Sequence, residues 1–284
     1  MNAVKVCALA AVIVLSLGVA AARAERGFVM LASTIGPIDA GIVAALEDAF
    51  EAETGVRVRH VGAGTGEALK IAQGGEIDLV MVHAKALEEK FVAEGYGTQR
   101  IPLMYNDFVI VGPPADPARI RGMKSATQAL TILAERAAPF VTRGDKSGTH
   151  VAEMELWNKS GVKPSGSWYK VYEKGNEGNG PTLRYTDASG AYTLIDRATY
   201  LSLKKEVKLE VLVEGDEALL NRISLIPVDQ KRFPRVNAPD ATRFVNWLTA
   251  PEKGQRIIAG FGVERYGSPL FFPDSVRWHQ TNGK

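Results

Sequence analysis

Short apolar segments alternate with amphipathic segments through the first third of the chain. Apolar residues at helical spacing, among them Ile42, Leu46 and Phe50, define one face of a helix that Gly55 ends. We expect strands at residues 28–31, 56–61 and 77–82, with helices over 42–50, 67–73 and 85–94. This repeated strand–helix winding predicts a mostly parallel sheet with helices on both faces.

A second series of elements begins with a strand at 108–111, which ends at Gly112, Pro113 and Pro114. We then expect helices at 127–138, after Thr149, at 241–249 and at 252–259, and strands at 139–142, 192–195, 209–213 and 223–227. The glycine-rich stretch 175–180 is expected to be a loop. Two wound sets predict an α/β protein of two lobes, with a site in the cleft beyond the carboxyl ends of the strands.

The first 24 residues have the features of a secretory signal peptide. Lys5 precedes an apolar run over 6–22, and Ala22-Arg23-Ala24 is a small-x-small cleavage signal. A membrane anchor is the alternative, but the run is short and rich in alanine for a spanning helix. We therefore expect cleavage after Ala24 and a periplasmic mature chain.

Charge and cysteine content limit the classes of partner and of chemistry that we expect for this chain. The 284 residues carry a formal charge of +2, and removal of Lys5 and Arg23 with the signal peptide would reduce it to zero. Nucleic acids and anionic membranes select basic patches, and no block of Lys or Arg longer than two residues occurs. Cys7 is the only cysteine, so the mature chain is expected to have neither a disulfide nor a thiol nucleophile.

Two loops between a predicted strand and a predicted helix have the composition of anion sites. They are residues 62–66, Gly-Ala-Gly-Thr-Gly, and residues 142–150, Thr-Arg-Gly-Asp-Lys-Ser-Gly-Thr-His. A helix N-terminus presents unpaired N–H groups and a partial positive charge, and Arg143 adds a permanent one. The alternatives are a plain capped turn at 64–66 and a structural ion pair between Arg143 and Asp145.

Nucleotide and catalytic motifs are not matched. Glu67 occupies the place of the third glycine of a dinucleotide fingerprint, and Asp145 stands where a P-loop needs glycine. There is no Gly-x-Ser-x-Gly or His-Glu-x-x-His motif, and the histidines at 60, 83, 150 and 279 lack metal spacing. His83 is expected to be a buried, hydrogen-bonded histidine. A nucleophile and base made of Ser147 and His150 would be poorly oriented at a helix start, so we expect no enzyme.

Several segments occur in the order found in one known family. They are Val82-His83-Ala84, the run 104–113, Arg143-Gly144-Asp145 with 147–150, Trp168-Tyr169, Asp196-Arg197 and Glu214-Gly215-Asp216. With them, essentially the whole mature chain resembles the tungstate-binding proteins of ABC importers, a branch of the type II periplasmic binding proteins.

The resemblance implies two α/β lobes, joined by two crossing segments, that close over a tetrahedral oxyanion. Lobe boundaries are then expected at 25–108 with 225–284 for the first lobe, and at 109–224 for the second. Expected partners are tungstate, or molybdate, and an ABC permease of the inner membrane. The protein is expected to be a monomer without a cofactor, and any metal arrives only as oxyanion.

The resemblance also implies the ligand set. It comprises Ser33, Thr34 and Thr65 on the first lobe, Arg143, Ser147 and Thr149 on the second, and Asn179 in a Gly178-Asn179-Gly180 segment that matches a Gly-Met-Gly loop. The first loop departs from the family's run of hydroxyl residues at Ile35, Gly36 and Pro37. The alternative is therefore a binding or sensor protein for phosphate, sulfate or a carboxylate, since unfilled acceptor positions change selectivity.

Overall fold

The computed structural model describes residues 27–283, and the predicted signal peptide lies outside the described residues. The strands are β1 (Phe28–Thr34), β2 (Arg57–Ala63), β3 (Leu79–Val82), β4 (Ile101–Gly112), β5 (Phe140–Thr142), β6 (Tyr169–Val171), β7 (Thr193–Asp196), β8 (Glu210–Val213), β9 (Leu220–Pro227) and β10 (Phe272–Pro273). The helices are α1 (Ile35–Asp39), α2 (Ile42–Thr54), α3 (Thr65–Ala72), α4 (Lys85–Ala93), α5 (Ala126–Glu135), α6 (Gly148–Ser160), α7 (Asn179–Ala188), α8 (Arg197–Leu203), α9 (Ala238–Leu248), α10 (Gly254–Gly260), α11 (Val263–Tyr266) and α12 (Val276–Asn282), with short 3₁₀ turns η1 (Gly175–Glu177) and η2 (Glu217–Leu219).

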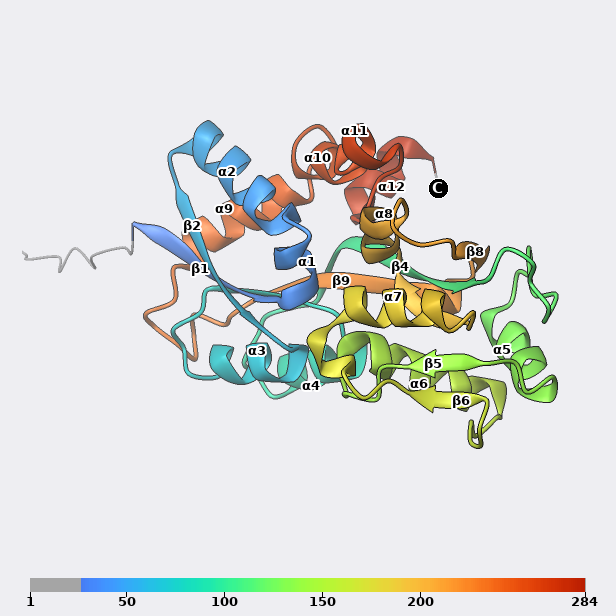
Figure 1. Ribbon diagram of the computed structural model, residues 1–284. Helices are drawn as coiled ribbons and strands as arrows, with labels where there is room; N and C mark the ends of the chain where they lie inside the picture. Colours follow the sequence, from blue (N-terminus) through green and yellow to red (C-terminus); the bar gives the residue numbers. More distant parts are fainter. Residues whose placement is uncertain (1–26, 284) are drawn as a thin grey trace, which may run out of the picture.

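The main sheet has the strand order β10-β4-β9-β3-β1-β2, and β7 and β8 also pair with β4. Helices lie on both sides of the strands β1, β4 and β9 (Figure 1). β1 pairs in parallel with β2 and with β3, as the strand–helix winding predicts. β9 enters antiparallel between β3 and β4, and β5 and β6 form a separate parallel pair. The predicted α/β fold of parallel strands flanked by helices is confirmed, with antiparallel strands added where β4 and β9 cross the molecule.

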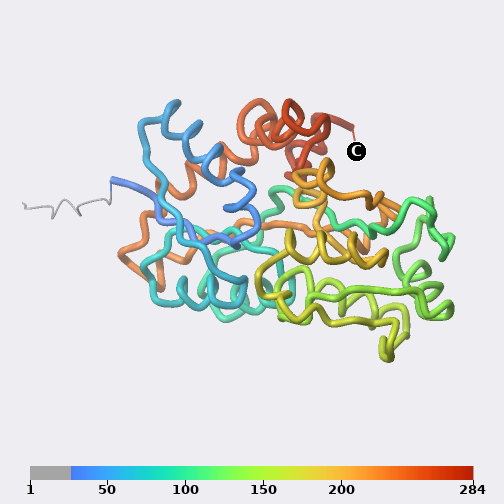
Figure 2. The backbone as a smooth tube through the Cα atoms, in the orientation of Figure 1, coloured from blue at the N-terminus to red at the C-terminus, as the bar shows by residue number. Residues whose placement is uncertain are grey.

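β4 is shared between two parts of the molecule. Residues 101–107 pair with β9, and residues 108–112 pair with β7 and β8. β4 and β9 run side by side through the middle of the chain trace (Figure 2). Each part has its own apolar core, one built from residues before 105 and after 222 and the other from residues 108–219. We call residues 28–107 with 220–282 lobe 1 and residues 108–219 lobe 2; their behaviour as separate domains stays a prediction.

The prediction for residues 175–180 is wrong in its second half. η1 covers residues 175–177, and α7 begins at Asn179. Gly178 separates the two with a positive φ of 114°, a conformation that glycine adopts readily. Pro181 then lies in the first turn of α7, where a residue without an N–H removes no helical hydrogen bond. The glycines around this helix start are typical of a loop, so the sequence pattern did not predict the helix.

Only the second half of β4 was predicted. Pro102 lies beside a register shift in its pairing with β9, and the polar residues Asn106 and Asp107 interrupt the apolar pattern. Within residues 27–283, no helix is long and apolar enough to cross a membrane.

Candidate anion-binding site

The first set of predicted site residues lies at the carboxyl ends of parallel strands. Ser33 and Thr34 end β1, and Thr65 begins α3 directly after β2. The register places Thr34 opposite Ala63 of β2 and Ser33 opposite Met81 of β3. Because parallel strands end at one edge of a sheet, these hydroxyl residues gather there, as the sequence predicts.

The β1 hydroxyls are buried and poorly paired. Ser33 is fully buried, and among the described residues its Oγ has a single hydrogen bond, 3.4 Å long, to the carbonyl oxygen of Thr34. Thr34 is 2 % exposed, and its Oγ1 has no hydrogen-bond partner among the described residues. An unpaired buried hydroxyl costs free energy, so one that faces a candidate anion site is a donor available to a ligand.

Arg143 follows β5, and its guanidinium is almost fully enclosed. Nε donates to the carbonyl oxygen of Gly175 at 3.2 Å, Nη1 donates to Oδ1 of Asn179, and Nη2 donates to Oδ2 of Asp145 at 2.5 Å. The side chain is 11 % exposed. The ion pair with Asp145, weighed as the alternative role, is therefore present. These bonds use three of the five guanidinium N–H groups and leave two for a ligand.

Asp145 ties Arg143 to the start of α6. Its Oδ1 accepts the backbone N–H of Ser147 at 3.1 Å. Burial raises the pKa of Asp145, but hydrogen bonds from Ser147 and the charge of Arg143 outweigh it, so the pKa lies below its usual value. The carboxylate is thus ionised at neutral pH and neutralises much of the charge of Arg143.

The hydroxyl residues of α6 lie in the same network. Ser147 caps the helix, since its Oγ accepts the N–H of His150 at 3.4 Å. Thr149 is 7 % exposed, and its Oγ1 accepts from Nδ2 of Asn179 at 3.0 Å. Nδ2 of Asn179 also donates to Oδ2 of Asp196 at 2.6 Å. The four predicted lobe 2 residues, Arg143, Ser147, Thr149 and Asn179, are therefore brought together.

The contact between His83 and Gly148 brings the end of β3 in lobe 1 against the start of α6 in lobe 2. His83 follows β3 in lobe 1, and Gly148 begins α6 in lobe 2. A Cβ atom added to Gly148 would lie 3.6 Å from Cε1 of His83, so the ring packs over the helix start. His83 is half-buried, so the expectation of a buried histidine holds only in part; loss of water contact lowers the pKa of its ring and keeps it neutral at pH 7. The edge of β1 and β3 thus faces the N-terminus of α6.

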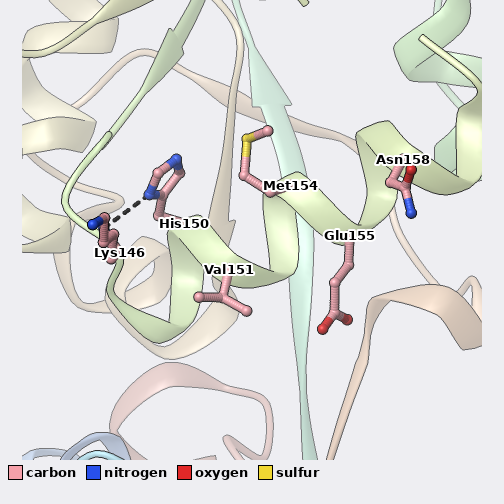
Figure 3. A pocket seen from close by; sticks show the side chains of 6 residues that line it. All are labelled: Lys146, His150, Val151, Met154, Glu155 and Asn158. Carbon is pink, nitrogen blue, oxygen red and sulfur yellow. Dashed lines mark hydrogen bonds between the residues drawn. The ribbon is translucent and has the colours of Figure 1, made fainter. Parts of the chain in front are cut away.

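One ring nitrogen of His150 is used within the anion loop itself. Its Nδ1 accepts the backbone N–H of Lys146 at 2.9 Å, and its ring lies beside Lys146 at the start of α6 (Figure 3). Both residues line a depression of about 320 Å³ whose other lining residues follow α6: Val151, Met154, Glu155 and Asn158. Residues 27–283 contain no group of three or more His, Cys, Asp or Glu side chains placed to hold a metal ion.

Sequence reasoning missed two parts of the network. Asp196 orients Asn179, and the carbonyl oxygen of Gly175 accepts from Arg143. Asp196 lay within a segment of the family resemblance, but its 17-residue separation from Asn179 gave no local signal of their contact. The contact follows from the packing of α7 beside β7.

Known proteins resemble this chain in sequence and in fold. Residues 19–252 match the PBP superfamily domain. The tungstate-binding protein TupA of Peptoclostridium acidaminophilum is 39% identical over 254 residues, which cover 89% of this chain and 87% of the relative. The chain belongs to this family of tungstate-binding proteins. The predicted resemblance is confirmed.

Two further relatives span most of the chain. The putative ABC transporter anion-binding protein of Haloferax volcanii is 42% identical over 251 residues, covering 87% of this chain and 72% of the relative. The structure of the TupA tungstate-binding protein from Desulfovibrio alaskensis G20 superposes with a TM-score of 0.81 at 38% identity, covering 87% of this chain and 99% of that one. All three relatives are named as binding proteins, and the type II periplasmic binding protein fold is confirmed.

Proposed function

We propose that this chain is a periplasmic receptor that binds tungstate, with molybdate as the close competitor, and delivers it to an ABC permease without performing chemistry. The observation that carries the proposal is the enclosed guanidinium of Arg143 at the start of α6, which keeps two N–H groups for a ligand. Lobe 1 adds the buried hydroxyl of Thr34, which has no hydrogen-bond partner among the described residues. Family membership supports the same function, and the signal peptide predicted over residues 1–24 supports the location.

The donors divide between the lobes. Ser33, Thr34 and Thr65 serve the ion from lobe 1, and Arg143, Ser147 and Thr149 serve it from lobe 2. A tetrahedral dianion offers acceptor sites in every direction, so hydroxyl and N–H donors on both sides are satisfied only when the lobes are together. Binding therefore stabilises the closed arrangement, in a protein that acts as a monomer.

Charge compensation comes from more than Arg143. The Arg143–Asp145 pair has a net charge of zero, so the unpaired N–H groups at the starts of α3 and α6 contribute the rest of the attraction. Donors without charge that are held rigidly distinguish two oxyanions of the same charge by the size and geometry of the ion.

A different small anion is the second candidate, and one observation favours it. Residues 35–39 form α1, and the Ile35 side chain that replaces a hydroxyl of the family pattern is 52% exposed. The first loop therefore supplies fewer side-chain donors than the resemblance implies. Phosphate, sulfate and acetate belong in the same titration.

The test is calorimetric titration of a chain of residues 25–284 with tungstate, molybdate, phosphate, sulfate and acetate. We expect tungstate to bind most tightly, and Arg143→Ala to weaken it by about 10- to 1,000-fold or more, as truncation of one member of a buried charge contact does. Arg143→Lys should retain part of the affinity. The matched control is Arg184→Ala, which removes a half-exposed ion pair with Glu206. Normal binding by Arg143→Ala would mean that the site is misplaced, and tighter binding of phosphate, sulfate or acetate would reassign the ligand.

A further inference from the structure

Asn179 occupies the centre of the lobe 2 network and uses every N–H that its side chain has. Oδ1 accepts from Nη1 of Arg143, while Nδ2 donates to Oγ1 of Thr149 at 3.0 Å and to Oδ2 of Asp196 at 2.6 Å. A primary amide has only two N–H donors. None is left for a bound ion in this arrangement.

The orientation of the amide is determined by its partners. Arg143 can only donate, so it faces the amide oxygen, and the carboxylate of Asp196 can only accept, so it faces the amide nitrogen. Asp196 is itself fixed, because Oδ1 accepts the N–H of Thr199 at 2.8 Å and Oδ2 accepts its hydroxyl at 2.6 Å as the cap of α8. Asn179 therefore has one stable orientation.

This orientation decides what its neighbours can offer. Because Nδ2 of Asn179 donates to the oxygen of Thr149, the hydroxyl hydrogen of Thr149 is free to point to another acceptor. Because Oδ1 of Asn179 fixes Nη1 of Arg143, the guanidinium plane is held at a third point besides Gly175 and Asp145. Both groups are thus prepared as donors before a ligand arrives.

We propose that Asn179 is a positioning residue of the anion site, which acts by orienting Arg143 and Thr149 and not by contacting the ion. The inference rests on the proposed function, since it assigns how the lobe 2 donors of that site are held. It revises the role expected from the sequence, in which Asn179 was a ligand. Holding donors in place lowers the entropic cost of binding, so loss of Asn179 lowers affinity through its neighbours.

The experiment is a double-mutant cycle measured with sodium tungstate by titration calorimetry. Asn179→Leu removes the amide at similar volume and should weaken binding by about 10- to 100-fold, the range for hydrogen bonds to charged groups. In a background that carries both Arg143→Lys and Thr149→Val, where both groups that Asn179 orients are already altered, the same change should cost less than about threefold beyond the background alone. Asn158→Leu, on the exposed side of α6, is the matched control and should bind as the unchanged chain does.

The outcomes separate the possibilities. An equal loss in both backgrounds would overturn the proposal, because Asn179 would then act independently of Arg143 and Thr149, as a direct ligand does. Asn179→Leu binding within threefold of the unchanged chain would also overturn it. If Asn179→Leu does not fold, Asn179→Ser is placed in the same cycle, since serine is tolerated at a helix start. Failure of the unchanged chain to bind tungstate, or of Arg143→Ala to weaken it, would instead count against the proposed function.

Discussion

Glu153 is a carboxyl group enclosed in the core of lobe 2, one helical turn beyond Thr149. It is 2 % exposed, and its Oε1 accepts from Nε1 of Trp157 at 3.0 Å and from the hydroxyl of Tyr169 at 2.7 Å. Burial raises its pKa to about 7 against the opposing effect of these hydrogen bonds. Glu153, the first carboxyl group of α6 after Thr149, is therefore neutral in mildly acid solution and ionised above neutral pH.

We expect this carboxyl group to make stability depend on pH. Its pKa is higher in the folded chain than the ordinary 4.5, so its contribution is fully present below about pH 4.5 and is lost as pH rises through about 7. Glu153→Gln keeps the acceptor oxygen and cannot ionise. Urea unfolding at pH 5 and at pH 8 should show the variant gaining stability relative to the unchanged chain at pH 8. An identical pH dependence of the two chains would contradict the shifted pKa.

At the scale of elements, Arg197 joins β4, which is shared by the two lobes, to the segment after β8. It begins α8, donates from Nε and Nη2 to both oxygens of Asp107 on β4 at 2.8 and 2.6 Å, and reaches Glu214 at 2.8 Å in the segment after β8. Asp107 is 6 % exposed, and hydrogen bonding to it raises the pKa of Arg197 above its usual value. The pair fixes β4 at the residue where it passes from β9 to β7.

Removing this guanidinium should destabilise the fold. Arg197→Met leaves the buried Asp107 carboxylate unpaired, which typically costs about 3 to 5 kcal/mol. The control is Arg184→Met, which breaks the exposed pair with Glu206 and should cost less than about 1 kcal/mol. Unfolding free energies from urea titration measure both, and comparable losses would show that Arg197 is no more than a surface pair.

The same elements show what sequence reasoning can reach. The sequence predicted the strand–helix alternation from β1 to β3 and the loops at Thr65 and Arg143. It could do so because the spacing of apolar residues, the helix starts and the glycine positions are local signals. The start of α7 and the long β4 were not, since Pro181 and Asp107 have meaning only in their tertiary surroundings. Likewise Arg143 and Asn179 are 36 residues apart, so their contact depends on how β5 and α7 pack.

At the scale of the whole molecule, the donors of the proposed site are shared between two cores that are joined through β4 and β9. An ion that contacts both lobes binds the folded chain and has no equivalent site in the unfolded one. Its binding free energy therefore adds to the stability of the fold as RT ln(1 + [L]/Kd), about 2.7 kcal/mol when the ligand is 100-fold above Kd. For a domain of this size, that corresponds to a rise in melting temperature of roughly 5 to 10 °C.

We therefore expect tungstate to raise the melting temperature of residues 25–284 in a concentration-dependent way. Each further tenfold excess should add about 1.4 kcal/mol of stability, because the linkage is logarithmic once the site is full. Scanning calorimetry with Arg143→Ala provides the control, since that variant should unfold near the ligand-free temperature of the unchanged chain and respond weakly to tungstate. An equal rise in both chains would place the ion elsewhere on the surface. No rise with tungstate or molybdate, beside a clear rise with phosphate or a carboxylate, would assign the proposed site to a different anion.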